Sequence, residues 1–109
     1  MMERRKHPRY KINVPVEIHT ESGGAPLHCA TSDLSLDGCY VESMYPFAVG
    51  TCLDIKLDTT DTLLISAKVV TCDPQFGNGI QFLRMLPEDQ ATLAKFLDHV
   101  AHQDVAPKA

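Results

Sequence analysis

The chain has 109 residues, of which 44% are hydrophobic and 22% are charged, as is typical of one soluble globular domain with a modest core. The first 11 residues carry five basic side chains and one acid, whereas the other 98 carry five basic side chains and 13 acids. An acidic body with a short basic arm argues against a nucleic-acid groove, which needs many cations, and favours a compact anion as ligand. Neither an apolar run of membrane-spanning length nor a signal peptide is found, so we expect no membrane insertion and a cytoplasmic location.

Four of the ten basic residues lie close together in an N-terminal arm, residues 1–10. Pro8 has a fixed φ and no N–H, which keeps its neighbours from continuing a helix. We therefore expect a flexible, irregular arm. Composition alone leaves a second interpretation open, in which the arm is only a solubilising tail.

Apolar and polar residues alternate in the next part of the chain, which predicts about six short strands. The predicted strands span residues 11–20, 27–31, 39–42, 53–57, 63–72 and 80–83. Turn-forming residues predict loops between them, including a turn-rich connection at 32–38 and a glycine turn at 77–79. Pro15 favours an edge position in the first strand. Consecutive antiparallel strands of this number close most simply into a small barrel or rolled sheet.

The hydrophobic period changes after residue 86 and predicts one C-terminal helix. Pro87 suits a first helical turn, and the acids at 88 and 89 favour its positive end. An apolar face is formed by Leu93, Phe96, Leu97 and Val100. We expect this helix to cover an open end or a seam of the barrel. The predicted domain spans residues 11–101, followed by a tail at 102–109.

Enzyme signatures are missing from the sequence, which has no nucleophile elbow, no P-loop and no dinucleotide-binding glycine pattern. The five histidines are scattered, and the four cysteines form no C-x-x-C pair. We therefore expect no catalysis, no metal site and no cofactor. The cysteines, including Cys39 and Cys52, are interpreted as small buried hydrophobic residues in a reducing compartment.

The arm contains the pattern Arg5-x-x-x-Arg9, with Arg4 directly before it. A guanidinium group can grip a phosphate through its planar fork of donors and can stack on a purine ring. Spacing of four in a non-helical segment lets both side chains converge on one ligand. An arginine pair at this spacing is common by chance, so the motif alone is weak.

A second pattern, Asp33-x-Ser35-x-x-Gly38, follows the second predicted strand. A carboxylate here can accept hydrogen bonds from a guanine edge or orient an arginine, and a hydroxyl can donate to a phosphate or a base. Glycine can supply a positive φ and allows close approach of a ligand or backbone. The same residue types also form ordinary turns, so this motif alone is not decisive either.

In this order and separated by one hairpin, the two motifs resemble those of the PilZ domain family, bacterial receptors for the second messenger cyclic di-GMP. Residues 77–82 also resemble the family's glycine-rich turn into its last strand. The resemblance covers about residues 3–100. It implies a six-stranded antiparallel β-barrel of the split-barrel type with a C-terminal helix, in agreement with the strand pattern.

The resemblance also implies a set of ligand-binding residues. They are Arg4, Arg5, Arg9, Asp33, Ser35 and Gly38. The two arginines of the R-x-x-x-R motif would clamp the phosphates and stack on the guanines, while the aspartate and serine would contact a guanine and hold the arginines in place. The glycine would keep the loop open. An arginine directly before the motif accompanies binding of an intercalated ligand dimer in this family.

Three functions follow as hypotheses. The leading one is a cyclic di-GMP receptor that reorders its arginine arm and signals through an unidentified partner protein, as a monomer or weak homodimer. The alternative is a protein-interaction adaptor that works without nucleotide, although such family members typically lack the arginine motif that this chain has. The third, an oligonucleotide binder, needs aromatic residues on a strand face, and only 6% of the residues are aromatic.

Overall fold

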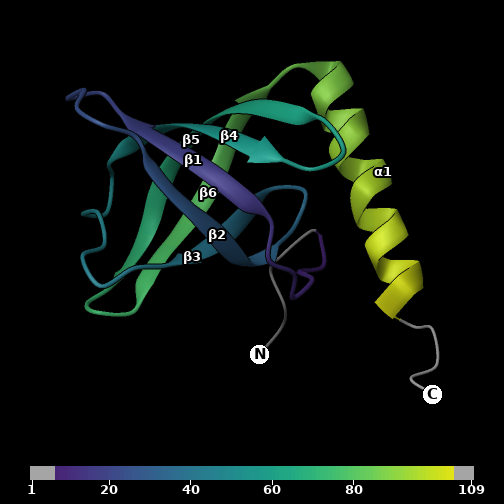
Figure 1. Cartoon of the computed structure of the whole chain (residues 1–109), viewed down its shortest axis with the longest axis horizontal. Coiled ribbons are helices and arrows are strands. Elements are labelled where there is room, and N and C mark those ends of the chain that lie inside the picture. The colour runs from purple at the N-terminus through teal and green to yellow at the C-terminus, as the bar shows by residue number, and fades with distance from the viewer. Residues whose placement is uncertain (1–6, 105–109) are drawn as a thin grey trace.

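Six antiparallel strands and one helix make up the described part of the chain (Figure 1), as the sequence predicts. The computed structural model describes residues 7–104, with side chains as far as residue 102. The elements are β1 (Pro15–Thr20), β2 (Leu27–Leu34), β3 (Gly38–Glu42), β4 (Cys52–Asp58), β5 (Thr62–Asp73), β6 (Gly77–Met85) and α1 (Pro87–Asp104).

The strands form a closed barrel in the order β1-β2-β3-β6-β5-β4, and β4 pairs with β1 to complete it. Each neighbouring pair is antiparallel. Closure of the barrel pairs the backbone N–H and C=O groups that an open sheet would leave without hydrogen bonds at its edges. Pro15, which has no N–H to donate, is the first residue of β1. It pairs with β2 but has no partner in β4.

The core lies inside the barrel, and strand alternation fills it. In β4, for example, Leu53, Ile55 and Leu57 are buried while the residues between them are exposed. The helix adds Leu93 and Leu97 to this core. Figure 1 shows α1 beside the barrel at the end where the β4–β5 hairpin lies, so the expectation of a helix that covers an end is confirmed.

Two strands differ from the prediction because pairing extends them. The second strand continues to Leu34, so Asp33 belongs to β2 and only residues 35–37 connect it to β3. The last strand begins at Gly77, and residues 77–79, predicted as a turn, pair with β3. The turn falls earlier, at residues 74–76, where Gln75 has a φ of 68°. The glycines at residues 77 and 79 therefore reflect close contact between neighbouring strands, not a turn.

The ends of two other elements also differ. The first strand begins at Pro15, not at residue 11, although Val14 is buried. The helix continues to Asp104, three residues past the expected end. No described helix has the length and apolar character needed to cross a membrane.

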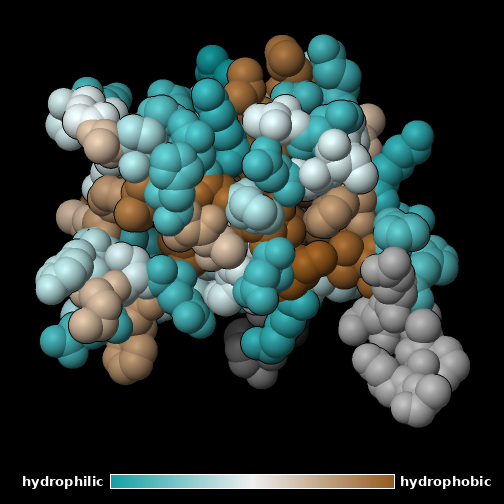
Figure 2. Space-filling model, in the orientation of Figure 1, coloured by the Kyte–Doolittle hydropathy of each residue, from teal (hydrophilic) through white to brown (hydrophobic). Residues whose placement is uncertain are grey.

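Outward-facing positions of a strand can be polar, as in β4, where Asp54, Lys56 and Asp58 are exposed. Figure 2 shows hydrophilic side chains over much of the visible barrel face, with apolar atoms between them. Among the cysteines, Cys39 is buried, but Cys52 is exposed and the other two are partly exposed. The expectation of a buried Cys52 was wrong because this residue opens β4 on the outward face.

Candidate ligand-binding site

The end of the basic arm is held against β2. Tyr10 and Leu34 exchange two backbone hydrogen bonds of 2.9 Å. Further along, the buried hydroxyl of Thr31 donates to the carbonyl of Ile12 at 2.6 Å and accepts from the N–H of Val14 at 3.0 Å. Residues 10–14 therefore follow β2 without being a regular strand. Their antiparallel course places the residue before Tyr10 diagonally across from the residue before Leu34, on the same face, where a long side chain can span the gap.

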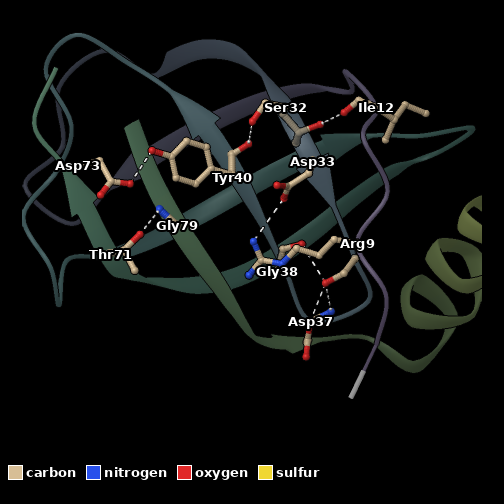
Figure 3. Close-up of polar contacts among 12 residues, drawn as sticks. Arg9, Ile12, Ser32, Asp33, Asp37, Gly38, Tyr40, Thr71, Asp73 and Gly79 are labelled. Carbon is tan, nitrogen blue, oxygen red and sulfur yellow. Dashed lines mark hydrogen bonds and ion pairs between the residues drawn. The ribbon is translucent and has the colours of Figure 1, made fainter. Parts of the chain in front are cut away.

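Those two residues are Arg9 and Asp33, one from each predicted motif. The Nη1 atom of Arg9 lies 3.6 Å from Oδ1 of Asp33, and both side chains are partly exposed (Figure 3). Oδ1 is buried and has no hydrogen-bond partner among the described residues. Since a buried acceptor without a hydrogen bond costs about 1–3 kcal/mol, this carboxylate has unused capacity for a donor. Arg4 and Arg5, the other predicted ligand-binding arginines, lie outside the described residues.

Ser35 begins the short loop between β2 and β3 and is fully buried. Its hydroxyl donates to Oδ1 of Asp37 at 2.6 Å, and its backbone N–H donates to the carbonyl of Gly38 at 2.8 Å. The N–H of Asp37 donates back to the serine hydroxyl at 3.2 Å. Ser35 thus closes the loop that follows Asp33, and its direct contact with a guanine stays a prediction.

Gly38 is the first residue of β3, opposite Gln81 of β6. A Cβ atom at this position would collide with the carbonyl oxygen of Ile80. The residue does not have a positive φ, so that part of the sequence interpretation was wrong. Close approach of two backbones, which the motif also allowed, is the reason for glycine here.

Tyr40 and Asp73 also lie near this site, and the motif analysis missed both. Tyr40 is the cross-strand partner of Asp33 on the outer face, and its hydroxyl donates to Oδ2 of Asp73 at 2.7 Å. Figure 3 shows the Tyr40 ring pointing away from Asp33 and toward Asp73. The alternation of residues in β3 predicts that Tyr40 lies on the outer face of the barrel. No local sequence pattern predicts its hydrogen bond to Asp73, which is 33 positions away.

The hydrogen bond to Asp73 raises the pKa of Tyr40 to about 12, with burial as a smaller cause. Because the folded pKa lies above the ordinary value of about 10, the bond stabilises the fold below pH 10 and this contribution is lost as the pH rises through 12. We expect Asp73→Ala to lower this pKa. Tyrosinate absorbance against pH, measured in a Y10F/Y45F background that leaves one tyrosine, tests this; an unchanged titration would contradict the bond.

Comparison of the sequence with models of known protein families identifies the family. A family model described as the PilZ domain matches residues 3–99. The match covers most of the sequence, so the chain belongs to the PilZ domain family. A comparison with curated proteins finds no match.

Solved structures share the fold at low sequence identity. MrkH of K. pneumonia, in a complex with c-di-GMP, has a TM-score of 0.78 at 16% identity, over 98% of this chain and 56% of MrkH. The Bacillus subtilis inhibitor of motility, MotI/DgrA, has a TM-score of 0.75 at 16% identity, over 98% and 54%. The PilZ domain of Escherichia coli YcgR with c-di-GMP has a TM-score of 0.69 at 13% identity, over 96% and 100%. The chain therefore spans about half the length of MrkH and MotI.

Proposed function

We propose that this protein is a receptor for cyclic di-GMP, with its binding site at the junction of the arm and β2. The observation that carries the proposal is the proximity of Arg9 to Asp33, whose buried Oδ1 has no hydrogen bond among the described residues. Membership of the PilZ domain family supports the choice of ligand, as do the MrkH and YcgR structures, which were both determined with c-di-GMP.

The chemistry of the ligand fits these two side chains. Cyclic di-GMP has two phosphates and two guanines, and a guanidinium group can bind the first and stack on the second. The carboxylate of Asp33 can accept hydrogen bonds from the N–H groups of a guanine edge, which would satisfy its unused oxygen. Ser35 and Gly38 support the loop and strand beside this carboxylate. The acidic body of the chain disfavours longer polyanions.

The remaining arginines of the arm complete the proposed site. Arg5, four residues before Arg9, would clamp a phosphate from a second side, and Arg4 would decide whether one ligand or an intercalated pair is bound. Binding would then hold the arm against the barrel and change the surface that a partner protein meets. A cytoplasmic location belongs to this proposal, since the ligand is a second messenger.

Calorimetric titration of the purified protein tests the proposal. We expect saturable binding of cyclic di-GMP and no comparable binding of GTP or GMP. GTP is the important control, because it offers guanine and phosphates without the cyclic arrangement. A protein that shows no saturable heat with cyclic di-GMP would refute the proposal, and partner capture that is independent of nucleotide would instead support the adaptor hypothesis.

A further inference from the structure

A hollow opens on the outer surface next to the Arg9–Asp33 pair, between the end of β3 and the turn from β5 to β6. Its volume is about 780 Å³. It is lined by Tyr40, Glu42, Ser43, Met44, Asp73, Gln75 and Phe76. The N–H of Ser43 donates to the carbonyl of Phe76, and the N–H of Phe76 donates to the carbonyl of Asp73, each at 2.9 Å. These backbone bonds tie the two segments together, so the hollow is formed in advance.

An aromatic ring forms the side of the hollow nearest the arginine site. Tyr40 lies against β6 at Gly77, where an added Cβ atom would be 3.0 Å from Cε2 of the ring. The ring is half-buried, and the hydrogen bond to Asp73 fixes its orientation. The part of the ring that borders the hollow is therefore a rigid, preorganised surface, which is what stacking of a planar base requires.

Apolar side chains surround this surface on the solvent side. Met44 is 66% exposed and Phe76 is 72% exposed, although both border the hollow. Large apolar side chains left open beside an aromatic ring indicate that something planar or apolar covers them.

The hollow continues directly from the site of the proposed function. Tyr40 is the register partner of Asp33, and cross-strand partners lie about 5 Å apart. Glu42, two residues further along β3, is then about 7 Å beyond Tyr40. A dinucleotide with two bases can span this distance, with one base near Asp33 and the other in the hollow.

The charges in the hollow decide which part of such a ligand enters it. The carboxylates of Glu42 and Asp73 border it, and no lysine or arginine does among the lining residues. Carboxylates repel phosphates but accept hydrogen bonds from the N1–H and N2–H₂ groups of guanine. The phosphates therefore remain at Arg9, and a base edge points toward the acids.

From these observations we propose that the hollow is a second base subsite, in which one guanine of the ligand stacks on Tyr40 with its hydrogen-bonding edge toward Glu42 and Asp73. The inference rests on the proposed function, because it assumes that a guanine dinucleotide binds at Arg9.

The test compares Tyr40→Leu with wild type by calorimetry with cyclic di-GMP. Loss of the stacking ring is expected to weaken binding by about 5- to 150-fold. Tyr40→Phe keeps the ring and should bind close to wild type. Tyr45→Leu is the matched control, since Tyr45 is 88% exposed and does not line the hollow; its affinity should be unchanged.

A second measurement shows whether the ring touches the ligand. In wild type, the ring-proton resonances of Tyr40, assigned from their loss in Y40L, should shift when cyclic di-GMP is added. Suppose that Y40L binds more weakly but the Tyr40 ring resonances of wild type do not shift on addition of ligand. That result would overturn the inference, because the tyrosine would then affect only the folding of the protein.

The outcomes separate the two proposals. Wild-type protein that binds no cyclic di-GMP refutes the proposed function and the subsite with it. Wild-type protein that binds, together with a Y40L variant of equal affinity, refutes the subsite alone and leaves the hollow to a protein partner.

Discussion

Replacement of Arg9 with alanine is expected to weaken cyclic di-GMP binding by at least about 100-fold, or about 2.7 kcal/mol. The variant loses the charge-assisted hydrogen bonds to the phosphates, each worth about 1.5–3 kcal/mol. It also leaves the Asp33 carboxylate, now 3.6 Å from the guanidinium, without its ion-pair partner. Calorimetric titration of both proteins measures the effect. Arg9→Lys should recover only part of the affinity, because an ammonium group has no planar fork.

Lys11→Ala provides the matched control for this prediction. Lys11 is an exposed cation of the same segment, two residues away, and no predicted motif includes it. We expect less than a twofold change in affinity. Equal losses in the two variants would contradict the proposed site and indicate general attraction between a basic arm and an anion.

Replacement of Gly38 with alanine is expected to destabilise the fold by about 3 kcal/mol or more, as steric overpacking of a backbone contact does. A Cβ atom here meets the carbonyl oxygen of Ile80 in the adjacent strand, and backbone atoms cannot move aside as a side chain can. The change would separate β3 from β6 at the point where the loop of residues 35–37 joins the barrel. Urea unfolding of both proteins gives the difference in the free energy of unfolding.

Gly23→Ala is the control for the glycine itself. Gly23 has a φ of 84° and no atoms near its Cβ position, so the cost there is backbone strain of about 1 kcal/mol without a collision. If Gly38→Ala instead keeps wild-type stability and loses only ligand binding, close approach of the ligand, not of β6, explains this glycine.

Local patterns in the sequence were enough to predict the elements. Alternation such as Leu53, Ile55 and Leu57 depends only on the two faces of a strand, and the face with Leu93 and Leu97 depends only on helical periodicity. The barrel and its terminal helix followed from these patterns. Element ends did not, because pairing decides them: residues 77–79 have turn composition but pair with β3.

The kinds of side chain at the candidate site could also be predicted from the sequence. The sequence by itself determined the types and order of the motif residues: guanidinium groups in the arm, then a carboxylate, a hydroxyl and a glycine. It could not show that Ser35 is turned inward to close its own loop, because that depends on the hydrogen bond to Asp37.

Tertiary structure alone decided which groups meet. Arg9 lies beside Asp33 because Tyr10 pairs with Leu34, and Tyr40 reaches Asp73 because β3, β6 and β5 are neighbours in the barrel. Both contacts join residues more than 20 positions apart, so strand order and register place them and no local pattern does. The sequence therefore specified the chemistry of the site, and closure of the barrel set its geometry.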